Sequence, residues 1–304
     1  MAKTLGAFLA VLALAAGLSA CNPDLGDRKG TEENPFTWVL VPSIDPITVQ
    51  NGAEAIAAFI KEEKGIVIEP IVADSFLAAV DMLCAGEADM GALNTFGYLV
   101  AHDLRGCAEV GLVSERFGTT FYQGQIVIGA DSEIASISDL KGQTFCRPDP
   151  TSTSGWIIPS LSMLAQGVEP ESDLGAITES DGHDGVIRDV YAGTCQAGAT
   201  FADARRNVEV EIPDVYDRVL VLLETVPIPN DNISYATAVL PSDRERLNEA
   251  FLSLTGSELG LSLLMIPQNW EGLMVQEDRF YDGFRRLLRE AEINIEEFVI
   301  AGQA

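Results

Sequence analysis

The alternation of short apolar runs with helical patterns is the feature that most limits what this chain can fold into. After residue 35, three strand-like runs appear, and each is followed by a helical pattern. The predicted strands are 36–41, 66–72 and 88–93, and the predicted helices are 52–64, 76–83 and 96–103. This alternation is typical of a mostly parallel sheet covered by helices on both faces, so we predict an α/β fold.

The same alternation restarts after Tyr122, which indicates a second α/β unit. Predicted strands occur at 125–128, 143–147 and 176–179, and predicted helices at 138–142, 156–166 and 184–191. Two further helices are predicted at 242–255 and 278–292, the first with a capping box formed by Ser242 and Glu245.

A faint internal repeat supports two similar lobes. Residues 86–92 and 193–199 align at a constant offset of 107 (193 minus 86), and both look like a helix stop followed by a strand. Chance recurrence of Gly and Ala in a chain with 27 glycines is the alternative.

The first twenty residues are predicted to be a signal peptide. Lys3 precedes an apolar run over 5–18, which is short for a membrane span but long enough for a signal sequence. Residues 18–21, Leu-Ser-Ala-Cys, resemble a bacterial lipobox, so we expect lipidation at Cys21; a plain secretory signal or a chance cysteine are the alternatives. Residues 21–35 are polar and are expected to form a tether, with the folded body beginning near Phe36.

Charge excludes some partners. The chain has 46 acidic and 19 basic residues, a formal charge of -27, so nucleic acid and acidic membrane surfaces are poor candidates. A small anion is not excluded, because a cleft sets its own local potential. The chain has two histidines and no CxxC motif, so we expect neither a metal site nor a cofactor.

The segment 149–156, Asp-Pro-Thr-Ser-Thr-Ser-Gly-Trp, is the most informative for chemistry. It places Ser152, Thr153 and Ser154 where a strand ends and a helix begins. First-turn amides have no intrahelical partner and favour negative charge, so this junction predicts an anion site. An ordinary helix cap in a polar turn is the alternative. The segment lacks the sequence of a phosphate-binding P-loop and of a serine-hydrolase GxSxG elbow.

Four motifs in order resemble the phosphate, phosphite and phosphonate-binding proteins of bacterial ABC transporters. They are DLKGQTFCRPD and DPTSTSGWIIP, then SDGHD at 180–184 and PIPND at 227–231. The resemblance runs from about Phe36 to Asp231 and implies the two-lobed type II periplasmic binding-protein fold. Each lobe would be a mostly parallel sheet flanked by helices, with two hinge crossovers. Lobe 1 would comprise 36–118 plus 227–304, and lobe 2 would comprise 119–226.

The resemblance also implies a phosphoryl site. It assigns Ser152, Thr153 and Ser154 to the phosphoryl oxygens, in agreement with the helix-start argument. His183 joins them, since an imidazole at a helix start can donate an N–H to an oxyanion. A structural or solvated histidine is the alternative.

Two acidic residues, Asp203 and Asp231, occupy the positions at which relatives that bind aminoalkylphosphonates hold the ligand ammonium. A location on a solvated face is the alternative for each, because the chain is rich in acidic residues.

The first lobe departs from the family pattern, so its cleft residues are the least certain. Ser75 stands where relatives commonly have Tyr, and the turn at 93–96 reads Leu-Asn-Thr-Phe. Asn94 and Thr95 still follow a strand at the ligand-facing edge of an open α/β sheet.

Four cysteines remain if Cys21 is lipidated, and export favours disulfides. They allow three pairings. We favour Cys84 with Cys107 and Cys146 with Cys195, because each pair then falls within one lobe.

We therefore expect a lipid-anchored, monomeric receptor outside the cytoplasm that captures a small phosphorus oxyanion and delivers it to an ABC permease. The membrane contact is expected through the lipid alone. One alternative is a binding protein that signals instead of transporting. Another is a hydrolase with Ser152 or Ser154 as nucleophile, His183 as base and an aspartate as its orienter, but no nucleophile elbow accompanies them, so we expect no enzyme.

Overall fold

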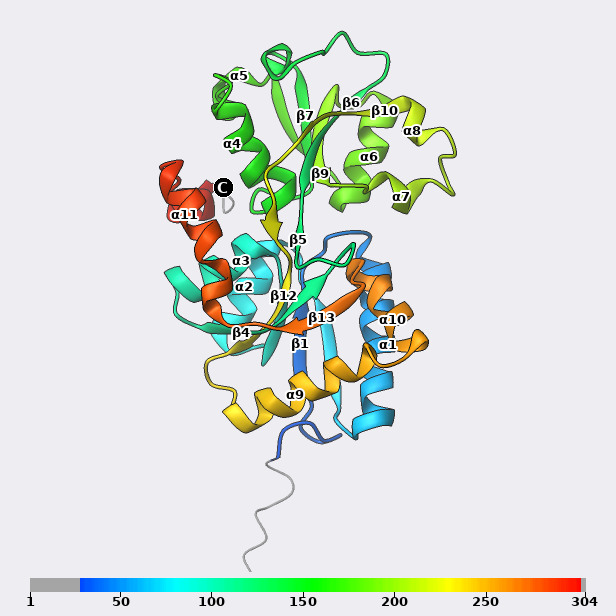
Figure 1. Cartoon of the computed structure of the whole chain (residues 1–304), viewed down its shortest axis with the longest axis vertical. Helices are drawn as coiled ribbons and strands as arrows, with labels where there is room; N and C mark the ends of the chain where they lie inside the picture. Colours follow the sequence, from blue (N-terminus) through cyan, green and yellow to red (C-terminus); the bar gives the residue numbers. More distant parts are fainter. Residues whose placement is uncertain (1–27, 302–304) are drawn as a thin grey trace, which may run out of the picture.

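The computed structural model describes residues 28–301 and shows two α/β lobes stacked along the long axis of the molecule (Figure 1). The predicted signal peptide and the lipidation at Cys21 lie outside these residues. Among residues 28–301, no single helix is long and apolar enough to cross a membrane. The helices α9 (Pro241–Leu254) and α10 (Glu258–Gln268) pass that test only as a pair, with a 105° bend between them.

Lobe 1 is built on a six-stranded sheet with the order β13-β4-β12-β3-β1-β2. Its strands are β1 (Phe36–Leu40), β2 (Ile68–Val72), β3 (Met90–Leu93), β4 (Ala108–Glu115), β12 (Asn232–Ala236) and β13 (Gly272–Val275). The helices that flank it are α1 (Pro46–Lys64), α2 (Phe76–Ala85), α3 (Thr95–Leu99), the π-helix η2 (Val100–Leu104), α9, α10, η5 (Asp278–Tyr281), α11 (Asp282–Glu290) and α12 (Ile295–Ala301).

Lobe 2 is built on a five-stranded sheet with the order β10-β6-β9-β7-β8. Its strands are β6 (Gly124–Gly129), β7 (Thr144–Arg147), β8 (Ala176–Glu179), β9 (Ala197–Phe201) and β10 (Val219–Glu224). Its helices are η3 (Ile137–Leu140), the π-helix η4 (Thr153–Ile157), α4 (Ile158–Leu164), α5 (Pro170–Asp173), α6 (Gly182–Ala192), α7 (Arg205–Val208) and α8 (Val215–Arg218).

The two sheets share one plan. In lobe 1, β12 lies antiparallel between β3 and β4, and in lobe 2, β6 lies antiparallel between β9 and β10. The internal repeat falls on equivalent elements: Gly86 ends α2 before β3, and Gly193 ends α6 before β9, both in the left-handed conformation. The strand that comes from the hinge is thus inserted at the same place in each sheet.

Two chain crossings connect the lobes. There β5 (Phe121–Tyr122) and β11 (Ile228–Pro229) form a two-stranded antiparallel ribbon at the waist of the molecule (Figure 1). Hydrogen bonds from the Gln123 side chain to the Thr225 carbonyl (2.8 Å) and from the Asn230 side chain to the Thr119 carbonyl (3.0 Å) tie the crossings together. The ribbon is short, which suits a hinge.

Several predicted elements differ in detail. The predicted capping box is wrong: α9 starts at Pro241, with Leu240 at the N-cap and no side-chain cap, because proline is favoured in the first helical turn. The predicted helix over 278–292 is divided into η5 and α11. The helix α10 was not predicted.

Residues 28–35, which were predicted to belong to the tether, pack against lobe 1. Lys29 pairs with Asp89 at 2.9 Å, and the Val67 amide donates to the Gly30 carbonyl. Residues 28–35 are therefore attached to the lobe.

The structure pairs Cys84 with Cys107 and Cys146 with Cys195, as favoured from the sequence. The first pair joins α2 to the segment before β4, and the second joins β7 to the segment before β9. Each disulfide thus lies within one lobe.

Candidate anion-binding site between the lobes

The hydroxyl-rich loop after β7 begins a helix that points at the interlobe space. Ser152 is the N-cap: its Oγ accepts the Gly155 amide at 3.1 Å, and its carbonyl accepts the Trp156 and Ile157 amides, which makes the first turn a π-turn. Ser152, Thr153 and Ser154 are all buried, at 1–2% exposure. Their hydroxyls and the unpaired first-turn amides form a donor-rich surface suited to an anion.

His183 lies beside this loop at the start of α6. Its Nε2 is 3.4 Å from Ser152 Oγ and its Nδ1 is 2.9 Å from Thr200 Oγ1. Burial, together with the nearby Arg116 guanidinium, lowers the pKa of His183 to about 3. The imidazole is neutral at physiological pH. It can donate from Nε2 when the Thr200 hydroxyl donates to Nδ1.

Arg116, at the end of β4, brings a positive charge to the site that sequence reasoning missed. It donates to Asp231 Oδ2 (2.6 Å), to Asn230 Oδ1 (3.1 Å) and to the Gln268 carbonyl (2.8 Å). Its guanidinium also lies over the Tyr122 ring, 5.2 Å from the centroid. Arg116 and Asp231 are both largely buried. Because they form an ion pair, each neutralises the charge of the other, and the hydrogen bonds hold the guanidinium in place.

Tyr122, on the hinge strand β5, is a second residue that sequence reasoning missed. Its phenol interacts with the Ser154 and Thr153 hydroxyls, and burial raises its pKa above the ordinary value. The phenol therefore stays protonated and can donate a hydrogen bond.

These residues enclose one small cavity between the lobes. Its volume is about 20 Å³, so it admits only a compact group. Lobe 1 contributes Asn94, Arg116 and Asp231, the hinge contributes Tyr122, and lobe 2 contributes Ser152, Thr153, Ser154 and His183. We call it the anion cavity.

Hydrogen bonds across the cleft hold the lobes closed. The Phe76 amide at the start of α2 donates to Asp149 Oδ2 (3.0 Å), and the Phe96 amide donates to Thr153 Oγ1 (2.9 Å). The His183 amide donates to the Ser43 carbonyl (2.9 Å). Gly182 before it has φ 67°, and a Cβ there would lie 2.9 Å from the same carbonyl, so only glycine allows this approach.

The remaining predicted residues take supporting positions. Ser75 caps α2 by accepting the Ala78 amide, which orients that helix start toward lobe 2. Asn94 caps α3 and donates to the Thr151 carbonyl (3.0 Å), and Thr95 donates to the Pro229 carbonyl in the hinge. Asn94 thus links lobe 1 to lobe 2 and Thr95 links it to the hinge, and of the three residues only Asn94 lines the anion cavity.

The two predicted ammonium ligands do not come together around one position. Asp231 lines the anion cavity but is paired with Arg116. Asp203 is about half exposed, has a left-handed φ of 64° and lines a neighbouring cavity instead.

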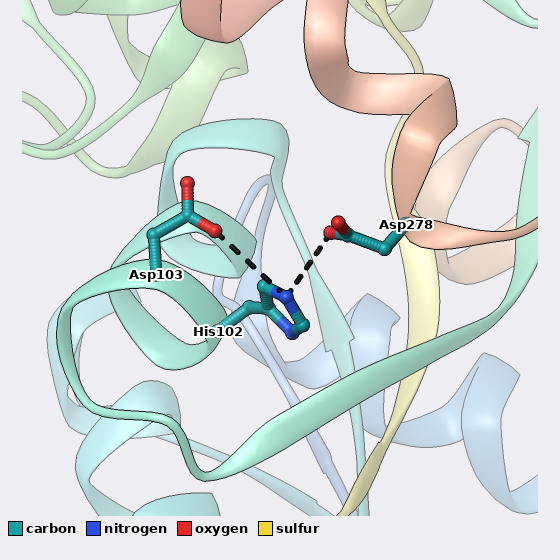
Figure 2. A group of neighbouring side chains, drawn as sticks. All are labelled: His102, Asp103 and Asp278. Atoms are coloured by element: carbon teal, nitrogen blue, oxygen red, sulfur yellow. Dashed lines mark ion pairs between the residues drawn. The ribbon is translucent and has the colours of Figure 1, made fainter.

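A second cluster of charged groups lies in lobe 1, away from the cleft. Figure 2 shows the His102 imidazole between the carboxylates of Asp103 and Asp278, a donor set that could suit a metal ion. Arg285 donates to both oxygens of Asp103 (2.7 Å each) and to Asp278 (3.1 Å), and the Tyr98 hydroxyl donates to Asp278 (2.8 Å). Because Arg285 already hydrogen-bonds to both carboxylates, we interpret the cluster as an ion-pair network that attaches η5 and α11 to η2.

The geometry also argues against hydrolysis. The Ser152–His183 pair has no carboxylate behind the imidazole, since Nδ1 faces the Thr200 hydroxyl. An imidazole whose pKa is lowered to about 3 is a poor general base at neutral pH.

The fold and this closed interlobe cavity define a two-lobed type II periplasmic binding protein. Residues 38–278 match the family model described as "ABC transporter, phosphonate, periplasmic substrate-binding protein". The chain therefore belongs to the family of periplasmic phosphonate-binding proteins of ABC transporters.

Individual relatives agree with this family. The phosphate-import protein PhnD of Mycolicibacterium smegmatis is 26% identical over 196 residues, which span 60% of this chain and 61% of that protein. A binding protein of an ABC phosphonate transporter from Pseudomonas aeruginosa superposes with a TM-score of 0.77 at 17% identity, covering 85% of this chain and 87% of that one. PhnD1 from Prochlorococcus marinus, solved with methylphosphonate, gives 0.72 at 15% identity, covering 84% and 98%. These solved structures share the fold.

Proposed function

We propose that this protein captures a phosphonate, phosphite or phosphate in the anion cavity and delivers it to an ABC permease. The convergence of the Ser152, Thr153 and Ser154 hydroxyls with His183 and Tyr122 on one buried cavity carries the proposal. Several neutral donors and one paired arginine can bind a doubly charged group without a large positive field.

We further propose that the ligand carries no ammonium group. Asp231 Oδ2 already pairs with Arg116 at 2.6 Å, so this carboxylate offers an ammonium no uncompensated negative charge. We therefore expect 2-aminoethylphosphonate to bind no more tightly than methylphosphonate.

Calorimetric titration tests the ligand class. The full chain, with Cys21→Ala to prevent lipidation, is titrated with phosphate, phosphite, methylphosphonate and 2-aminoethylphosphonate. Ser154→Ala should weaken binding about tenfold to a hundredfold, the usual effect of losing a hydrogen bond to a charged group. Ser162→Ala, whose hydroxyl bonds the Ile158 carbonyl on the same helix, is the matched control. Equal affinities of the Ser154→Ala variant and the control would contradict the site.

The lipid anchor and the permease are part of the proposal. Metabolic labelling with palmitate should mark the wild-type chain but not the Cys21→Ala variant. Loss of the protein should abolish uptake of the bound compound. Normal uptake with altered gene induction would instead identify a sensor.

A further inference from the structure

A second, larger cavity adjoins the anion cavity. It has a volume of about 290 Å³, and its lining residues come from the turn after β4, the start of α7, the end of α10 and the hinge. Arg116, Tyr122, Phe201 and Asn269 line both cavities. The two cavities therefore adjoin each other, and we call the second one the side chamber.

The charged groups that line the side chamber already have partners. Arg116 pairs with Asp231, and Asp203 lies 3.8 Å from Arg205. Glu271 accepts the Phe117 amide at 2.7 Å. The rest of the lining is rich in aromatic rings, with Phe117 from the turn after β4 and Phe121 from the hinge strand β5. Such a lining suits an uncharged apolar group and gives little preference to a cation.

Phe117 is placed there at a conformational cost. It has φ 53° and is followed by Gly118 with φ 70°, in a two-residue turn closed by the Arg116–Thr119 bridge. Such turns favour Asn-Gly or Asp-Gly, and a bulky residue in the left-handed region is strained.

Phe117 is also 54% exposed, so its ring is not needed for the core. The guanidinium of Arg206, from lobe 2, lies 5.4 Å from the ring centroid and covers it across the cleft. An exposed, strained aromatic ring at the mouth of a cavity points to ligand contact.

We propose that the side chamber holds the organic substituent of the ligand, and that this substituent is an uncharged, ring-bearing group. The inference rests on the proposed function, because it assumes that the phosphoryl group occupies the anion cavity. Phe117 would contact the ring, and Ala202 would form part of the chamber that the ring fills.

Titration of the Cys21→Ala full chain with phosphate, methylphosphonate and benzylphosphonate tests this. We expect benzylphosphonate to bind about tenfold more tightly than methylphosphonate, because the ring adds buried apolar area. Phe117→Asn suits the left-handed turn, so it removes the ring without disturbing the fold. It should weaken benzylphosphonate about fivefold and leave methylphosphonate unchanged. Ala202→Phe should fill the chamber and abolish the benzyl advantage.

The outcomes separate the two proposals. If no phosphorus compound binds, the proposed function fails and the inference fails with it. If methylphosphonate binds but benzylphosphonate does not, the side chamber is not a ligand subsite. The same holds if Phe117→Asn and Ala202→Phe both bind benzylphosphonate as tightly as wild type. In either case the proposed function of the anion cavity is retained. If Phe117→Asn reduces only uptake by the permease, the Phe117 ring serves docking to the permease and the inference is overturned.

Discussion

His183 should make the ligand-free protein less stable in mild acid. Its pKa is lowered to about 3 in the folded chain by burial and by Arg116, against an ordinary value of 6.5. Between these values the unfolded chain binds a proton that the folded chain does not, so the free energy of unfolding falls as the pH decreases. The stability is fully present above pH 6.5 and is lost progressively down to about pH 3.

The size of this loss follows from the pKa difference. At about pH 4.5 the imidazole is protonated in the unfolded chain but not in the folded chain. This pH lies about 2 units below the ordinary pKa, and at about 1.36 kcal/mol per unit the free energy of unfolding falls by about 2.7 kcal/mol. That is a large part of the about 5–15 kcal/mol that stabilises a typical domain. His183→Gln should abolish this contribution.

Urea unfolding, followed by tryptophan fluorescence with both disulfides intact, measures the effect. Carboxylates titrate in the same range, so the informative quantity is the difference between wild type and His183→Gln at about pH 7.5 and at about pH 4.5. His102→Gln is the control for loss of a histidine elsewhere. If wild type and His183→Gln lose the same free energy between the two pH values, the buried neutral imidazole is refuted.

Three further predictions concern the cleft and its support. Asp149→Asn removes a charged acceptor for a lobe 1 amide, so phosphonate affinity by calorimetry should fall about tenfold; unchanged affinity would contradict a role in closure. Gly124→Ala would put a Cβ 2.8 Å from the Ser154 carbonyl, so urea unfolding should show a loss of about 1–3 kcal/mol together with weaker binding. Replacing Cys146 and Cys195 by alanine opens a link spanning 49 residues and should cost about 4 kcal/mol in the same unfolding assay.

The sequence predicted elements whose causes are local. Apolar periodicity located β1 and α1, and the glycine stops at 86 and 193 located equivalent helix ends in the two lobes. The sequence did not predict α10. Pro267 lies inside this helix, and proline disfavours a helix locally, but tertiary packing overrides that preference.

The candidate site divides in the same way. Ser152 and its neighbours could be found because a helix start is a local feature that attracts anions. Arg116 and Tyr122 could not be found from local features. Arg116 follows a strand and Tyr122 lies in the hinge, and only closure of the lobes brings both residues to the anion cavity. Asp231 was a candidate from the resemblance, but its pairing with Arg116, 115 residues away along the chain, was not predicted.

The insertion of β12 between β3 and β4 also bears on the order in which the chain can fold. Ser234 pairs with both Gly91 and Val110, so the lobe 1 sheet stays open, with two unpaired edges, until the last quarter of the chain arrives. The lobe 2 sheet needs only residues 124–224. We expect lobe 2 to complete its sheet first as the chain emerges after export, and the exposed edges of β3 and β4 to be where a stalled chain aggregates.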